Sequence, residues 1–196
     1  MKNLKSIAVG MAASLFLFAC ASSGPRKTLD ELASALQNNN PQEFLSCLDM
    51  EAYANNTLAS ITGGNAVFHS LNSISSMLGL GGLDQMINSV IDYRAELRDT
   101  LAKGVASGEL TLQCQRGGET NCPWVASSLR EAAIVEIAPS AAIAKVTTPA
   151  KLTSWIALRK SGDKWLVTGQ ALMEDDARRY AMSGNRPAPD PGAKSI

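Results

Sequence analysis

The stretch WIALRKSGDKWLV, Trp155–Val167, alternates bulky apolar with polar side chains on both sides of a Ser-Gly-Asp turn. This alternation around a glycine-containing turn predicts an antiparallel hairpin. Two further apolar runs precede it, AAIVEIA at 132–138 and AAIAKVTTP at 141–149. The segments KLTSWIALRK and KWLVTGQALM form the two arms of the hairpin. The sequence therefore predicts an antiparallel meander over residues 132–173.

The residues before the meander carry helical signals. Thr28-Leu29-Asp30-Glu31 is a capping box and predicts a helix from Thr28 to about Gln37. Pro41, after Asn40, opens a second helix, and residues 83–104 follow the helical period of 3.6. ELTLQCQ, which begins at Glu109, alternates with period two and predicts a strand, and PWVASSLREA holds one helical turn. Helices followed by a meander predict an α+β domain with N-terminal helices on one face of a curved antiparallel sheet.

The meander also carries a resemblance. AAIVEI, AAIAKV and WIALRKSGDKWLVTG together resemble the closing strands of NTF2-like domains, and ELASALQNNNPQEFLSCLDMEAYANN, residues 31–56, is similar to their opening helices. Many bacterial lipoproteins and envelope proteins of unknown function share this pattern, including the DUF4878 and DUF2939 types. The resemblance implies an NTF2-like or cystatin-like fold. It implies no universal set of catalytic residues.

The N-terminus has the pattern of a secretory signal. Lys2 and Lys5 precede an uncharged run that is too short to cross a bilayer, which takes about 20 residues. The sequence LFAC, ending at Cys20, resembles the bacterial lipobox, which implies cleavage before Cys20 and attachment of acyl chains, palmitate among them, that anchor the protein to a membrane. The alternative is an ordinary signal cleaved near Ala19 or Ala21.

The residue after the cysteine bears on localisation. By resemblance to proteobacterial sorting, Ala21 in place of Asp favours the periplasmic face of the outer membrane. The expected organisation is a lipoprotein signal peptide at 1–19, a lipidated tether at 20–27, a single domain at 28–180 and a disordered tail at 181–196.

Charge and cysteines narrow the function further. The chain has 18 basic and 18 acidic residues, and loss of Lys2 and Lys5 leaves 16 against 18, so no basic patch favours nucleic-acid binding. Cys114 and Cys122 flank a Gly-Gly turn, and in an oxidising compartment we expect a disulfide between them. A metal pair is the alternative, but no histidine lies nearby. Cys47 falls on an apolar helical stripe and is expected to be a buried thiol.

The sequence offers little for catalysis. His69, the single histidine, has no acidic residue near it between Glu51 and Asp84, so no triad is indicated. The run from Glu174 to Asp176 is interpreted as a solvated helix start, because three oxygens are too few for calcium. We therefore predict no metal, no cofactor and no enzymatic activity.

Two functions remain. In the first, helices and sheet enclose an apolar concavity that binds a small apolar ligand or a partner peptide. Its candidate lining residues, which would otherwise simply fill a core, are Phe68, Leu71, Leu78, Met86, Trp155 and Trp165. In the second, the protein is an envelope scaffolding or assembly factor that uses its uncharged segment 54–83 against another envelope protein.

Overall fold

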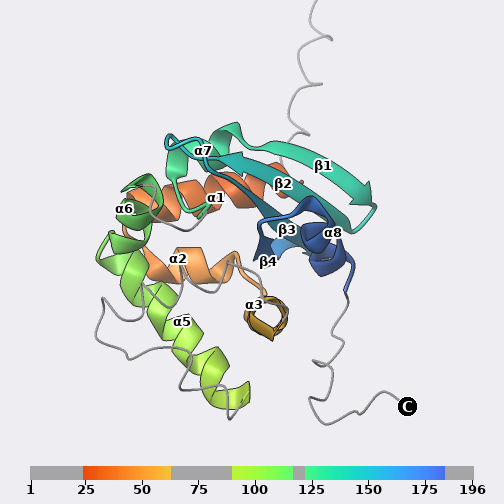
Figure 1. Cartoon of the computed structure of the whole chain (residues 1–196), viewed down its shortest axis with the longest axis horizontal. Coiled ribbons are helices and arrows are strands. Elements are labelled where there is room, and N and C mark those ends of the chain that lie inside the picture. The colour runs from red at the N-terminus through yellow and green to blue at the C-terminus, as the bar shows by residue number, and fades with distance from the viewer. Residues whose placement is uncertain (1–23, 63–89, 117–121, 184–196) are drawn as a thin grey trace, which may run out of the picture.

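The computed structural model describes residues 24–62, 90–116 and 122–183, and these form helices packed on an antiparallel sheet (Figure 1). The elements are α1 (Pro25–Gln37), α2 (Pro41–Ser46), α3 (Met50–Thr62), α5 (Val90–Ala106), α6 (Glu109–Arg116), α7 (Ala126–Glu131), β1 (Ala133–Ala138), β2 (Ala141–Thr147), β3 (Thr153–Ser161), β4 (Lys164–Ala171) and α8 (Glu174–Met182).

The meander is confirmed. Its four strands lie in the order β1-β2-β3-β4, and every neighbouring pair is antiparallel. The turn between β3 and β4 joins Ser161 to Lys164, and Gly162 within it has a φ of 60°, which glycine adopts without strain. The chain is thus an α+β protein, as the sequence predicts.

One face of the sheet, here called the inner face, packs on most of the helices. The strands contribute alternate side chains to it, and α1, α2, α3, α5, α6 and α7 contribute the rest of one large core. The strand residues of this core are Ala142, Ala144, Val146, Ile156, Leu158, Trp165 and Val167. The inner face therefore holds most of the apolar burial of the domain.

The opposite, outer face is also covered, which corrects the expectation of helices on one face only. Helix α8 packs across β2, β3 and β4, and its acidic first turn, Glu174–Asp176, is the helix start that the sequence indicates. The core beneath it consists of Ala141, Ile143, Ala157, Ala171, Ala177, Tyr180 and Ala181. Ala181 and Met182, which the sequence analysis places in the tail, belong to this helix.

The first helix starts earlier than its capping box predicts. Gly24 is the N-cap and Pro25 the first helical residue, so the helix includes residues assigned to the tether. The Thr28 hydroxyl instead donates a hydrogen bond to the Trp165 carbonyl at 2.7 Å, which joins α1 to β4. At α2 the prediction is confirmed, because the side chain of Asn40 accepts from the Glu43 amide at 3.2 Å.

The predicted strand at ELTLQCQ is wrong, because this segment is helix α6. Leu110 and Cys114 are buried, while Leu112 between them is 41% exposed. Residues four apart share one face of a helix, and alternate residues share one face of a strand. In the sequence, positions 110, 112 and 114 are all apolar, which fits an alternating strand, and positions 110 and 114 also fit one face of a helix, so alternation alone could not decide between them.

The free edge of β4 is covered by the chain around the start of α3. The Asp49 amide donates to the Val167 carbonyl, and the Val167 amide donates to the Cys47 carbonyl, both at 2.9 Å. The Asn56 amide group adds a bond of 2.8 Å to the Thr168 carbonyl. Arg159 of β3 forms an ion pair of 2.8 Å with Asp49. These bonds satisfy an edge that would otherwise be open to pairing with other chains.

Candidate functional site

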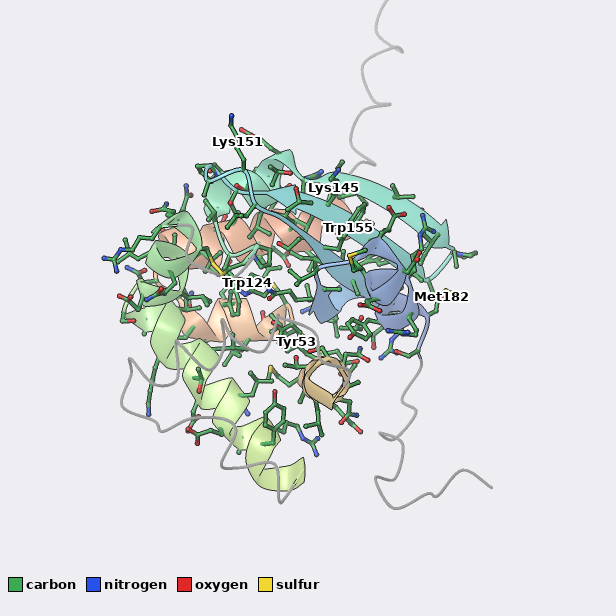
Figure 2. All side chains as sticks on the ribbon, in the orientation of Figure 1. Tyr53, Trp124, Lys145, Lys151, Trp155 and Met182 are labelled. Carbon is green, nitrogen blue, oxygen red and sulfur yellow. A yellow bond between two sulfur atoms is a disulfide. The ribbon has the colours of Figure 1, made fainter. Side chains whose placement is uncertain are left out.

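Of the six predicted ligand-binding residues, the structure describes two, Trp155 and Trp165, and it places them on opposite faces of the sheet. Trp165 is buried on the inner face, whereas Trp155 is half-buried on the outer face with the Lys145 ammonium 5.8 Å from its ring centroid (Figure 2). The two tryptophans therefore cannot line one concavity. The remaining candidates lie outside the described residues: Cys20, Phe68, Leu71, Leu78 and Met86.

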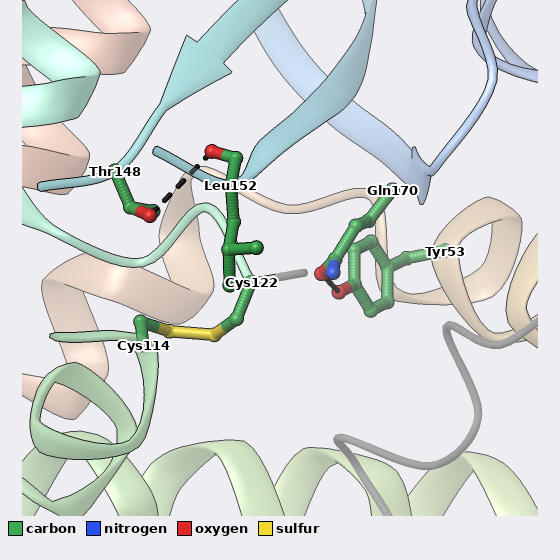
Figure 3. The surroundings of a disulfide bond; sticks show 6 residues. All are labelled: Tyr53, Cys114, Cys122, Thr148, Leu152 and Gln170. Atoms are coloured by element: carbon green, nitrogen blue, oxygen red, sulfur yellow. Dashed lines mark hydrogen bonds between the residues drawn. A yellow bond between two sulfur atoms is a disulfide. The ribbon is translucent and has the colours of Figure 1, made fainter. Parts of the chain in front are cut away.

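The predicted cysteine pair is present. Cys114 and Cys122 lie at disulfide-bonding distance, with their Cα atoms 5.0 Å apart, and both are buried. The bond connects α6 to the buried segment that leads from Cys122 to Val125 and carries Trp124. Figure 3 shows Tyr53 and Gln170 in the surroundings of this disulfide. The disulfide therefore holds the Trp124 segment and α6 together at one side of the inner core.

A group of buried polar and aromatic side chains lies on the inner face around Tyr53. We call it the inner polar cluster and define it as Tyr53, Tyr93, Trp124, Ser154 and Gln170, all of them buried. The Tyr53 hydroxyl donates to the Gln170 side-chain oxygen at 3.4 Å. The ring centroid of Trp124 lies 6.5 Å from that of Tyr53 and 5.1 Å from that of Phe44, which it meets edge-on.

Three polar atoms of this cluster have no hydrogen-bond partner. Among the buried side chains of the described residues, Tyr93 Oη, Trp124 Nε1 and Ser154 Oγ are unpaired, and so is Thr100 Oγ1 two helical turns after Tyr93 on α5. Buried polar atoms are nearly always paired in folded proteins, and each unpaired one costs about 1–3 kcal/mol. The unpaired atoms lie on α5, on β3 and in the segment before α7.

The phenols of the cluster stay neutral. Burial raises the pKa of Tyr93 far above its usual 10, and burial, with the neighbouring Tyr93, does the same to the pKa of Tyr53. The polar side chains buried in the described part of the chain are all Ser, Thr or Gln, apart from the tyrosines and tryptophans. The cluster can therefore donate hydrogen bonds, but it offers no charged group to a ligand.

Cys47 does not offer a nucleophile. Its thiol is buried, as predicted, and lies 3.8 Å from a Glu31 carboxylate oxygen. Burial first, and then the charge of Glu31, raise the pKa of Cys47 to about 12. Because only the thiolate reacts readily, Cys47 is an inert side chain at physiological pH.

A small polar hollow of about 80 Å³ lies beside Cys47, between α1 and the β3–β4 turn. Lys27, Glu31, Asp163 and Lys164 are among its lining residues. Its lining is largely polar and charged, which suits water or a small polar molecule rather than an apolar ligand. The inner polar cluster is the better candidate site.

Within residues 24–62, 90–116 and 122–183, no three His, Cys, Asp or Glu side chains come together as metal ligands would. None of the helices in these ranges is long and apolar enough to span a bilayer. The chain matches no protein-family model, no curated protein and no solved structure. The class that fold and site define is therefore an α+β domain with a buried, uncharged, hydrogen-bonding cluster.

The sequence analysis missed the residues of this cluster, although one signal was available. Tyr93 lies three residues after Val90 and four before Leu97, on the apolar stripe of the predicted helix. Tyr93 is fully buried, whereas its neighbour Arg94 is only partly buried. A buried tyrosine hydroxyl needs a hydrogen-bond partner, and this requirement could have identified Tyr93 as a candidate site residue.

Proposed function

We propose that this protein is a membrane-anchored periplasmic lipoprotein with an NTF2-like domain, and that it binds a small, largely apolar ligand or a peptide against the inner face of its sheet. The observation that carries this proposal is the set of unpaired buried polar atoms in an aromatic and aliphatic core. Ligand sites are mostly apolar and contain a few polar groups that fix orientation. The inner polar cluster has this composition.

The anchor part of the proposal rests on the LFAC sequence. Lipidation at Cys20 would leave four residues, 21–24, before the first helical residue Pro25. Four extended residues reach at most about 14 Å. A lipidated Cys20 would therefore hold the domain directly at the membrane surface.

The anchor is tested by fractionation. Replacing Cys20 by Ala is expected to move the protein from the membrane fraction to the soluble periplasm, because each buried methylene of an acyl chain contributes about 0.8 kcal/mol of membrane affinity. Cys47→Ala is the matched control, since it removes a cysteine that takes no part in anchoring. Unchanged membrane association of Cys20→Ala contradicts the lipoprotein proposal.

The domain is proposed to be non-catalytic. Glu136 on β1 and Glu131 on α7 are both exposed, so they do not form a pair of acids inside the domain. Cys47 is inert for the reason given above. General acid–base chemistry requires a titratable pair within reach of a substrate, and the inner polar cluster contains only neutral side chains.

Ligand binding is tested by native mass spectrometry of the Cys20→Ala protein purified gently from the periplasm. We expect an additional non-covalent mass of small-molecule or peptide size that is lost on denaturation. Protein that was unfolded and refolded without cell extract serves as the control. A bare protein from the periplasm argues against a resident ligand.

A second candidate function, envelope scaffolding, is favoured by a separate observation. Val135, Met173 and Met182 are 45%, 64% and 60% exposed, and they lie on β1 and at the two ends of α8. A photo-crosslinking residue at Met182, introduced in intact cells, is expected to capture an envelope protein if this surface is used. The same residue at Lys151, on the exposed β2–β3 turn, is the control position.

A further inference from the structure

The two edges of the sheet differ. The edge of β4 is closed by the chain around Leu48, which forms a bridge to Val167. At the other edge, β1 pairs with β2, and no further segment among the described residues hydrogen-bonds to its backbone. Strand residues direct their amide and carbonyl groups alternately to the two sides, so half of these groups on β1 point away from the sheet. Figure 1 shows β1 at the outer margin of the sheet.

The apolar side chains of β1 are incompletely covered. Val135 pairs with Ile143 of the outer core, so it lies on the outer face. Helix α8 packs across β2, β3 and β4, and Val135, one strand further out, is 45% exposed. Ile134, on the inner face, packs against the inner core and is only partly buried. A further strand at this edge would cover both side chains and continue both apolar layers.

Glu136 gives this edge its charge. It pairs with Ala142 of the inner core, so it lies on the inner face, where its side chain is exposed. Within the part of the chain that the structure describes, no Lys or Arg forms an ion pair with it. The register shifts between Glu136 and Ala138, and both a bulge and a charged residue limit unselective pairing at an edge strand. The edge therefore favours a partner that brings a positive charge to Glu136.

A second copy of this chain does not supply that charge. Two β1 strands could pair antiparallel about a two-fold axis, with their inner faces on the same side. In the registers that use most of the strand, the two Glu136 carboxylates are then opposite or diagonal to each other. Like charges opposite one another destabilise a strand pair. The charge of Glu136 therefore favours a different chain over a second copy.

We infer that the edge of β1 is a docking site for an extended segment of another envelope protein, which places an apolar side chain beside Val135 and a Lys or Arg beside Glu136. The inference deepens the scaffolding function and rests on it. Hydrogen bonds to the outward backbone groups of Ala133–Glu136 supply affinity, and the contacts with Val135 and Glu136 supply specificity.

The test uses two capped peptides, acetyl-TVKVTV-amide and acetyl-TVEVTV-amide, which differ only in the charge of the third residue. The full chain with Cys20→Ala is titrated with each peptide at neutral pH, and its backbone amide signals are followed by nitrogen-15 NMR. We expect the lysine peptide to bind about tenfold more tightly, because an attractive cross-strand pair replaces a repulsive one. We also expect the outward amide protons of Ala133–Glu136 to move downfield, while the amides of β4 act as internal references.

Glu136→Lys tests the charge directly. Because it reverses the charge of an exposed side chain on β1, we expect the glutamate peptide to become the tighter binder, by about tenfold. Glu131→Lys is the matched control, since it makes the same change at an exposed position on α7, outside the strand. It should leave the order of the two peptides unchanged.

The outcomes separate the inference from the scaffolding function. Equal affinities for the two peptides, shifts outside β1, or no reversal with Glu136→Lys overturn the inference. A concentration-dependent dimer of the unbound protein in which the same β1 amides shift assigns the edge to a second copy and also overturns it. If crosslinking from Met182 captures an envelope protein while neither peptide binds, the inference fails alone; if neither is found, both fail.

Discussion

The two faces of the sheet are packed in different ways. The outer face is a thin, alanine-rich layer under α8, and its buried Thr168 hydroxyl is paired with the Tyr180 carbonyl. The inner face carries a much larger core with aromatic side chains, yet it contains the unpaired atoms of Tyr93, Trp124 and Ser154. Among the described residues, none of the buried side-chain atoms without a partner belongs to the outer face.

Side-chain size explains the close packing of the outer face. Ala157 and Gly169 face one another across β3 and β4, and a Cβ atom on Gly169 would lie 2.9 Å from a ring carbon of Tyr180. Small residues let α8 approach the sheet so closely that a side chain at position 169 would crowd Tyr180. The outer face thus serves stability, and under the proposed function the inner face would also contribute to recognition.

The largest effect that tests this comparison is expected from Trp124→Ala on the inner face. Trp124 is fully buried against Phe44 and Tyr53, so its removal should lower the free energy of unfolding by about 3–5 kcal/mol. Trp155→Ala on the half-buried outer side should cost clearly less. Urea unfolding of both variants measures the difference, and equal losses would remove the proposed asymmetry between the faces.

The next effect concerns the disulfide that supports the inner face. Replacing Cys114 and Cys122 by Ser should lower the free energy of unfolding by about 2.5 kcal/mol, because the bond closes a loop with a sequence separation of eight. Thermal unfolding with and without a reductant checks this value. A wild-type protein whose melting temperature does not respond to the reductant would contradict it.

Gly169→Ala tests the close packing of the outer face. The added methyl group meets the Tyr180 ring, so we expect a loss of about 1–2 kcal/mol in the free energy of unfolding. Combining it with Tyr180→Leu should give less than the sum of the two single effects, since the clash is shared. Strict additivity in this double-mutant cycle would show that the two residues do not compete for space.

A smaller effect separates paired from unpaired hydroxyl groups. Thr168→Val removes a paired hydroxyl and should destabilise by about 1 kcal/mol. Tyr93→Phe removes an unpaired one and should leave the unliganded protein as stable as before or slightly more stable. Denaturant melts of the unliganded proteins decide this, and a clear destabilisation by Tyr93→Phe would mean that its hydroxyl is paired.

The last prediction concerns Cys47, which is expected not to react with an alkylating reagent in the native protein. Since the pKa of this thiol is raised from 9.0 to about 12, native protein at pH 8 should resist iodoacetamide, while protein in urea should react. The unfolded thiol ionises near pH 9 and the folded one near pH 12. Burial of the neutral Cys47 thiol therefore contributes to stability below pH 9, and this contribution is lost as the pH rises from 9 to 12. Rapid labelling of native protein would show that Cys47 is open to solvent.

Local signals predicted part of this molecule well. The strands from Ala133 to Ala171, the cap at Asn40 and the cysteine pair follow from alternation, turn residues and spacing, all of which act over a few residues. The prediction was wrong at α6, because apolar residues at positions 110, 112 and 114 fit a strand, while 110 and 114 also fit one face of a helix. It was also wrong for the start of α1, where Thr28 bonds to distant Trp165.

The sequence by itself determined the α+β class, the meander and the buried nature of Cys47, since each depends on the order of apolar and polar residues along the chain. Only the tertiary structure placed Trp155 and Trp165 on opposite faces and gathered Tyr53, Tyr93 and Trp124 into one cluster. Register and helix packing decide which side chains meet and which donors stay unpaired, and no local pattern records contacts between residues so far apart in the chain.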